Sequence, residues 1–167
     1  AFGAVYPKHF QRKQSYVSQG NNTLLFYGEL YNELDSLTEV EYTLLMFEKY
    51  GVQCLSNLNG PFAFFCWNES AQTLLAATDR LGRFPLFYCL IDETICITSD
   101  LHPLFASGLM TPSLAQESVI DFLTIGFPLG EKTMFDGIKR ATAGEYLLCS
   151  PNGIEKERYW KPEYSNT

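Results

Sequence analysis

The chain has 167 residues, which is the size of one domain and is long enough to bury about 70% of its unfolded surface. Hydrophobic residues make up 46% and aromatic residues 15% of the chain, which excludes an intrinsically disordered protein. The net charge of −7 argues against a general nucleic-acid binder, which would carry a basic stripe. The longest apolar runs are as short as strands, so we expect neither a transmembrane span nor a signal peptide.

Two short apolar segments, residues 2–6 and 23–29, open the chain and flank a polar stretch with a turn signal. A helix is predicted to begin at Thr38, because Thr38 and Glu41 have the spacing of a capping box. Gly51 is a typical residue at which such a helix ends.

Strands dominate the rest of the sequence. Three hairpins are predicted, which pair residues 61–67 with 73–79, 84–90 with 94–99, and 145–149 with 154–160. The first two hairpins are apolar on nearly every residue, which is typical of strands that are covered on both faces. A second helix is predicted from Ser113, with Gln116 in the capping-box position, to about Gly126.

The five cysteines indicate a protein with free thiols. They are Cys54, Cys66, Cys89, Cys96 and Cys149. Their number is odd, and no two have the C-x-x-C spacing of a zinc or redox site. We therefore expect buried free thiols in a reducing, cytoplasmic compartment and no metal site.

Several segments occur in an order that one known family shares. They are Gly28-Glu29-Leu30-Tyr31-Asn32, Glu39-Val40-Glu41, Leu58-Asn59-Gly60-Pro61-Phe62-Ala63-Phe64, Asp79-Arg80-Leu81-Gly82-Arg83-Phe84-Pro85-Leu86-Phe87-Tyr88, Thr98-Ser99-Asp100-Leu101, Thr133–Ile138 with Gly144, and Tyr159-Trp160. The series resembles the motifs N-G-E-I-Y-N, D-T-E-V, L-N-G-M-F-A-F, D-R-L-G-x-K-P-L-Y-Y, A-S-E-L, T-x-F-x-G-I and Y-W of the class II glutamine amidotransferase domain in asparagine and β-lactam synthetases. It covers residues 24–160, and the ordered set is far more specific than any one motif.

This resemblance implies an α+β fold of the Ntn-hydrolase type. Such a fold is a four-layer αββα sandwich, in which two mainly antiparallel sheets lie between helical layers. We expect residues 1–160 to form the amidotransferase-like domain and residues 161–167 to be a tail or the start of a linker.

The resemblance also reveals departures in the catalytic machinery. In the family, an N-terminal cysteine attacks the side-chain amide of glutamine, and its own α-amino group can serve as the base. Here the position of the nucleophile is held by Ala1 or Phe2, so we expect no catalytic residue. The family's R-G-P-D segment, and the arginine loop that grips the glutamine carboxylate, have no counterpart between Ala1 and Thr23.

A remnant of the glutamine pocket is expected at Tyr27, Gly28, Glu29 and Glu39. By resemblance, Tyr27 replaces the asparagine that donates a hydrogen bond to the oxyanion, and the loss of one such donor costs about 10²–10³ in rate. Glu39 replaces the aspartate that faces the amino group of the substrate. Gly28 and Glu29 are retained, and a purely structural role in the turn is the alternative for both.

The sequence thus predicts a glutaminase-inactive domain that docks on an ATP-dependent, asparagine-synthetase-like domain or subunit. Asp79, Arg80 and Arg83 are the candidate interface residues, and a strand-end ion pair between Asp79 and Arg80 is the structural alternative. ATP and magnesium are expected only on the partner, since this chain has no S-G-G-x-D-S loop. We expect no nucleic-acid or membrane partner, and a homo-oligomer stays possible.

Two other functions remain open at this point. One is an active class II glutaminase that supplies ammonia to asparagine synthesis, with its N-terminal cysteine replaced by Ala1. The other is a stand-alone binding module without a synthetase partner.

Overall fold

The computed structural model describes residues 15–163. Its larger sheet is antiparallel and has the strand order β1-β2-β3-β4-β8-β9. These strands are Tyr16–Gln19 (β1), Asn22–Gly28 (β2), Phe62–Asn68 (β3), Thr73–Thr78 (β4), Glu145–Ser150 (β8) and Gly153–Arg158 (β9). The smaller sheet has the order β6-β5-β7 and consists of Phe87–Ile91 (β5), Thr94–Thr98 (β6) and Lys139–Arg140 (β7).

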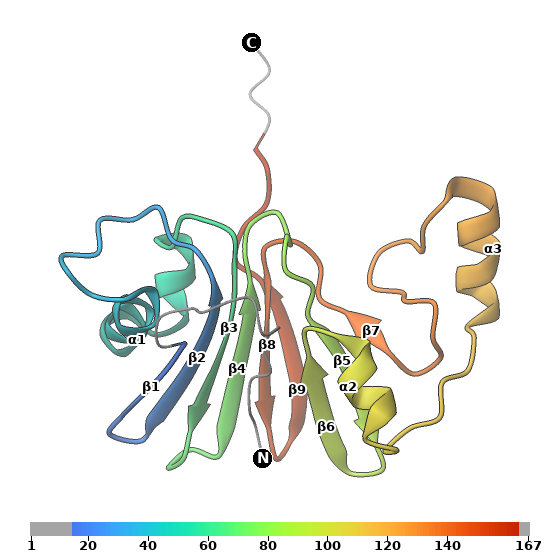
Figure 1. Ribbon diagram of the computed structural model, residues 1–167, viewed down its shortest axis with the longest axis horizontal. Coiled ribbons are helices and arrows are strands. Elements are labelled where there is room, and N and C mark those ends of the chain that lie inside the picture. Colours follow the sequence, from blue (N-terminus) through green and yellow to red (C-terminus); the bar gives the residue numbers. More distant parts are fainter. Residues whose placement is uncertain (1–14, 164–167) are drawn as a thin grey trace.

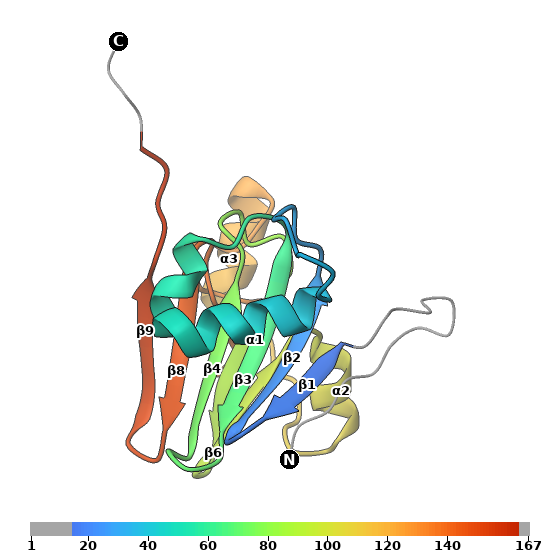
Figure 2. The same cartoon turned by 90° about the vertical axis from the view of Figure 1, so that its left-hand side faces the viewer.

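Helices lie outside both sheets (Figure 1). Helix α1, Glu39–Tyr50, runs across the larger sheet and continues into a 3₁₀ helix, η1, at Gly51–Ser56 (Figure 2). Helix α2, Leu101–Ala106, covers the smaller sheet, and α3, Gln116–Ile125, stands beyond it at the end of the molecule (Figure 1). None of the helices within residues 15–163 is long and apolar enough to cross a membrane.

Three separate apolar cores show that the fold has four layers. The first joins α1 to the larger sheet through residues such as Leu44 and Phe64. The second fills the space between the two sheets and includes Leu86 and Leu147. The third joins the smaller sheet to α2 through residues such as Leu104. The α+β, αββα arrangement expected from the sequence is therefore confirmed.

The position of strand β3 between two apolar cores explains why its sequence is apolar on nearly every residue. Phe62 and Phe64 belong to the core under α1, whereas Ala63 and Phe65 belong to the core between the sheets. Because successive side chains of a strand point to opposite faces, a strand in the middle of four layers has no polar side.

The predicted helix boundaries are confirmed at α1 and corrected at α3. The side chain of Thr38 accepts a hydrogen bond from the N–H of Glu41, and the Glu41 carboxylate accepts one from the N–H of Thr38, which is a complete capping box. At α3 the N-cap is Ala115, not Ser113, because the Ser113 hydroxyl contacts Asp136 and makes no cap.

Four short elements were missing from the predictions, namely β1, η1, α2 and β7. Strand β1 is largely exposed, because within residues 15–163 it is an edge strand whose one partner is β2. Helix α2 has only six residues, which is too short for an apolar period to show in the sequence. The expected apolar segment at 2–6 lies outside the described residues.

Candidate functional site

The end of β2 crosses the loop before β3 at very close range. The N–H of Glu29 donates to the carbonyl of Pro61 at 2.9 Å, and the N–H of Tyr31 donates to Asn59 at 2.8 Å. Gly28 has a φ of 138°, and a Cβ atom there would lie 2.2 Å from the carbonyl oxygen of Pro61. A side chain cannot be accommodated at Gly28 without moving backbone, so the glycine of the Y-G-E motif fixes this crossing.

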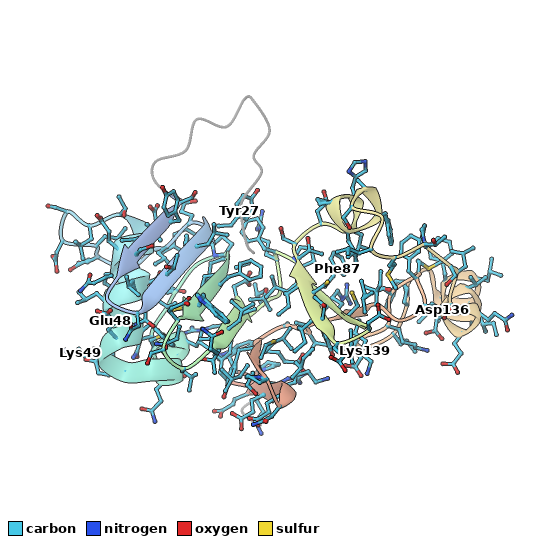
Figure 3. The ribbon with its side chains drawn as sticks, turned by 90° about the horizontal axis from the view of Figure 1, so that it is seen from below. Tyr27, Glu48, Lys49, Phe87, Asp136 and Lys139 are labelled. Carbon is cyan, nitrogen blue, oxygen red and sulfur yellow. The ribbon has the colours of Figure 1, made fainter. Side chains whose placement is uncertain are left out.

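Tyr27 points into the space between the two sheets. It lies opposite Ala63 in the register of β2 with β3, and Ala63 belongs to the core between the sheets. Its ring packs edge-on against Phe84, with 4.7 Å between the ring centroids and an interplanar angle of 81°. Figure 3 shows Tyr27 at this position between the sheets. An aromatic side chain thus occupies the place that the resemblance assigns to the oxyanion-binding amide.

The two acidic residues of the expected pocket lie apart from this face. Glu29 follows Gly28 and is exposed. Glu39 is the first residue of α1, which packs on the opposite face of the larger sheet from Tyr27, and its carbonyl accepts a hydrogen bond from Thr43 at 2.7 Å. An acidic side chain is also favourable at a helix N-terminus. The structure therefore places Tyr27, Gly28 and Glu29 together and puts Glu39 in a different layer.

Asp79 organises the loop after β4. It is 3% exposed, and its carboxylate accepts hydrogen bonds from the backbone N–H groups of Phe62 at 3.3 Å, Leu81 at 2.8 Å and Arg83 at 3.0 Å. Its own carbonyl accepts from Gly144 at 3.0 Å. Buried backbone donors need such an acceptor, so Asp79 has a structural role in holding three segments together.

The two arginines of this loop differ in their surroundings. Arg80 donates from Nη2 to the carbonyl of Ser56 at 2.7 Å, which ties the loop to the end of η1. Its Nε is buried and has no hydrogen-bond partner among residues 15–163. Arg83 is exposed. The structural alternative, an ion pair between Asp79 and Arg80, is wrong, because no salt bridge within the described residues joins them and backbone N–H groups surround the carboxylate.

The remnant pocket and the candidate interface loop are physically connected. Asp79 binds the N–H of Phe62, and the preceding Pro61 accepts from Glu29. Asp79 also binds the N–H of Arg83, and the next residue, Phe84, carries the ring that packs on Tyr27. Sequence reasoning missed Phe84, although its place in the motif after Asp79 was a usable signal.

The end of β9 is fastened to the same loop. The hydroxyl of Tyr159 donates to the carbonyl of Thr78 at 2.7 Å, and burial raises the pKa of Tyr159. The N–H groups of Tyr159 and Trp160 both donate to the carbonyl of Gly144. Tyr159 and Trp160, the Y-W pair of the resemblance, therefore have a structural role, since they join the end of β9 to the end of β4 and to Gly144.

A separate cavity of about 670 Å³ lies beside the first turn of α3. It is lined by Leu114, Ala115, Gln116, Glu117, Ser118, Glu131, Lys132, Thr133, Phe135, Asp136, Gly137, Ile138 and Lys139. Figure 3 shows Asp136 and Lys139 at this end of the molecule. None of the site residues predicted from the sequence lines this cavity. Within residues 15–163, no group of His, Cys, Asp and Glu side chains gathers to hold a metal ion.

Glu131 is the electrostatic centre of this region. Its carboxylate accepts from Lys156 at 2.6 Å, from the hydroxyl of Tyr88 at 2.9 Å and from Lys139 at 3.2 Å. These hydrogen bonds, the one from Lys156 above all, lower the pKa of Glu131 to about 2. The group links the smaller sheet to β9 of the larger one.

Comparison with known proteins agrees with this geometry. Amidase chry2 from Gibberella zeae is 31% identical over 128 residues, which cover 76% of this chain and 18% of that protein. The glutamine-hydrolyzing asparagine synthetase 3 of Bacillus subtilis is 27% identical over 155 residues, which cover 84% of this chain and 25% of that protein. The chain thus spans about a fifth to a quarter of the length of these curated relatives.

The fold has solved counterparts. Glutamine phosphoribosylpyrophosphate amidotransferase from B. subtilis superposes with a TM-score of 0.57 and 17% identity, over 96% of this chain and 34% of that one. At this identity the likeness concerns the Ntn-type fold alone. Residues 12–160 match the family described as the glutamine amidotransferase domain. The chain therefore belongs to the class II glutamine amidotransferase domain family and is related to the corresponding domains of asparagine synthetases.

Proposed function

We propose that this amidotransferase domain does not hydrolyse glutamine and instead serves an ATP-dependent, asparagine-synthetase-like domain that forms amide bonds. The observation that carries the proposal is Tyr27, which stands in the family's oxyanion position with its ring against Phe84.

The reason is steric as well as chemical. An asparagine amide donates its hydrogen bond close to the backbone, whereas the phenol hydroxyl of a tyrosine lies at the far end of a rigid ring. The ring of Tyr27 also fills space on the face where a substrate amide would bind. A misplaced donor loses the preorganised stabilisation of the oxyanion, which is worth about 10²–10³ in rate.

The relatives support the second half of the proposal. Those named asparagine synthetase are several times longer than this chain, which leaves room for the region that would bind ATP and magnesium. In this chain the exposed Arg83, with Asp79 and Arg80 shaping its loop, is the best candidate contact for that region. The domain would then support its partner by shape and not by supplying ammonia.

The direct test is glutamate release by the protein purified with its natural N-terminus. Ala1 and Phe2 lie outside the described residues, and the family match begins at residue 12, so the natural first residue must be determined alongside. We expect no glutamate above a no-protein control. Sustained turnover by this protein, with a cysteine as its first residue, would establish the alternative of an active glutaminase.

A second set of variants isolates Tyr27. A chain given an N-terminal cysteine, by Phe2→Cys with Ala1 deleted, is expected to stay inactive, since groups that act as a unit fail together. Adding Tyr27→Asn should raise any residual activity, whereas the matched control Tyr16→Asn, at a residue that is 58% exposed on β1, should not. Robust activity with the cysteine alone would contradict the proposal.

Dependence on a partner separates the proposal from a stand-alone binding module. The natural protein should consume ATP with a carboxylate and an amine as co-substrates, through the synthetase region. Full function without any such region, in the same polypeptide or in a co-purifying subunit, would favour the binding module.

A further inference from the structure

Helix α3 exposes an unusual amount of apolar surface. Six large side chains of the helix and the loop after it are between 45% and 80% exposed, and they are Ile120, Phe122, Leu123, Ile125, Phe127 and Leu129. We refer to these six residues as the α3 surface. Ile120 and Leu123 lie on one side of the helix and Phe122 and Ile125 on the other, because residues advance by about 100° each. A helix that is apolar on opposite sides is typical of a buried element.

The rest of the domain does little to stabilise this helix. Ser118, in the first turn, is its only fully buried residue. The helix is attached at its N-terminal end. There the N–H of Ala115 donates to the carbonyl of Met134, and Leu114 and Phe135 form an isolated β-bridge. Isolated helices of fewer than about 12 residues are marginal in water, and α3 has 10 residues. The body of α3 therefore needs packing that residues 15–163 do not provide.

The α3 surface is nevertheless held in one shape. Asp121 forms an ion pair with Lys132 at 2.5 Å and accepts a hydrogen bond from the N–H of Leu129 at 3.1 Å. Gly126 ends the helix in the left-handed conformation, with its N–H on the carbonyl of Phe122. These contacts fold the following loop back on the helix, so the helix and the loop hold their apolar side chains in one preorganised arrangement.

We propose that the synthetase-like region of the same polypeptide binds to the α3 surface and packs an apolar face over Phe122, Leu123 and their neighbours. This inference rests on the proposed function and names the place where the partner binds. An exposed apolar area of this kind marks an interaction site, and permanent interfaces are apolar in the way of a domain core cut in half.

The choice of occupant follows from length and charge. The relatives are about four to six times as long as the part that this chain matches, so each has further chain available to cover the helix. A second copy of this domain carries the same net charge of −7, and the long-range repulsion between the two copies opposes their association. Arg83 and the α3 surface are both exposed and can serve the same large partner.

The test measures how well Leu123 is covered in the full-length natural protein. Leu123→Cys is compared with Leu90→Cys, a matched variant at the end of β5 where the leucine is 63% exposed against 80% for Leu123. A maleimide probe reports the accessibility of each new thiol. Four of the five cysteines of this domain contribute little background, because Cys54, Cys66, Cys89 and Cys149 are buried and burial raises the pKa of each thiol to about 11 or 12. The half-buried Cys96, and any thiol outside this domain, are corrected for by labelling the unmodified protein.

We expect the thiol at 123 to react at least about tenfold more slowly than the thiol at 90, and the protection to be independent of protein concentration. A photo-cross-linker attached at 123 should join residues beyond 167 of the same polypeptide. Equal labelling rates would overturn the proposal, and so would cross-links to a second copy of α3 or protection that disappears on dilution. A second reporter, Phe127→Cys, should be labelled slowly in the natural background and rapidly when Leu123→Asp is added, because a charge at 123 releases the partner. Slow labelling in the double variant would also contradict the proposal.

This outcome is independent of the glutaminase assay. An active glutaminase with a covered α3 surface would refute the inactive-domain proposal alone. An inactive protein with a freely reactive thiol at 123 would refute the α3 proposal alone.

Discussion

The carboxylate of Asp79 holds the N–H of Arg83 at 3.0 Å, and this one bond closes the loop that places Phe84 on Tyr27. Because the same carboxylate also holds the start of β3 through Phe62, it connects the loop after β4 with the crossing at Gly28. The D-R-L-G motif therefore has a structural role in this chain, whatever its role toward a partner.

Asp79→Asn should destabilise the protein by about 2–4 kcal/mol, since an amide keeps only one acceptor oxygen for three backbone N–H donors around a buried side chain. The measurement is the free energy of unfolding in urea. Glu93→Gln, at an exposed turn residue, is the matched control and should change it by less than about 0.5 kcal/mol. Equal effects of the two variants would mean that the Asp79 hydrogen bonds contribute nothing specific.

Gly28→Ala should be among the most damaging single changes, at about 3 kcal/mol or more, because its Cβ would lie 2.2 Å from a backbone oxygen at a φ of 138°. Gly20→Ala is the control that separates the cost of a positive φ from the cost of a steric clash with the backbone. Gly20 also has a positive φ, of 57°, but no atom lies within 4 Å of its Cβ position, so this change should cost only about 1 kcal/mol. Thermal unfolding of both variants decides whether the crossing is as tight as the geometry requires.

Arg80→Ala and Arg83→Ala should differ in their effects on stability and on association with the proposed synthetase region. Arg80 is a candidate interface residue, but its hydrogen bond to the carbonyl of Ser56 predicts that Arg80→Ala lowers the free energy of unfolding by about 1–2 kcal/mol. Arg83→Ala should leave the melting temperature unchanged and weaken association with the synthetase region. If Arg83→Ala lowered stability and left association intact, Arg83 would be structural and not a docking residue.

Glu131 should give the protein an acid-sensitive component of stability. Its pKa is lowered from an ordinary 4.5 to about 2 in the folded state, so its stabilising contribution is complete above about pH 5 and is lost as the pH falls toward 2. Glu131→Gln should therefore be less stable than the natural protein at pH 7, and the gap should close between pH 5 and pH 2. A gap that stays constant over this range, in melting temperatures of both proteins, would show that the charge of Glu131 is not responsible.

The sequence alone was sufficient for features that depend on local chemistry. The capping box of Thr38 and Glu41 sets the start of α1 through contacts three residues apart. The uninterrupted apolar pattern of β3 and β4 already required layers on both faces of the sheet. The ordered motifs led to the amidotransferase family, because each is fixed in position along one chain.

Tertiary structure decided what depends on residues far apart in sequence. An ion pair between Asp79 and Arg80 was the structural alternative, but Asp79 instead accepts from three backbone N–H groups and Arg80 donates to the carbonyl of Ser56. The resemblance assigned Glu39 to the same pocket as Tyr27, whereas the larger sheet lies between them. The capping-box spacing of Ser113 and Gln116 predicted the helix α3 but not that its body would find no partner within residues 15–163, because burial is a property of the packed surface and not of the segment.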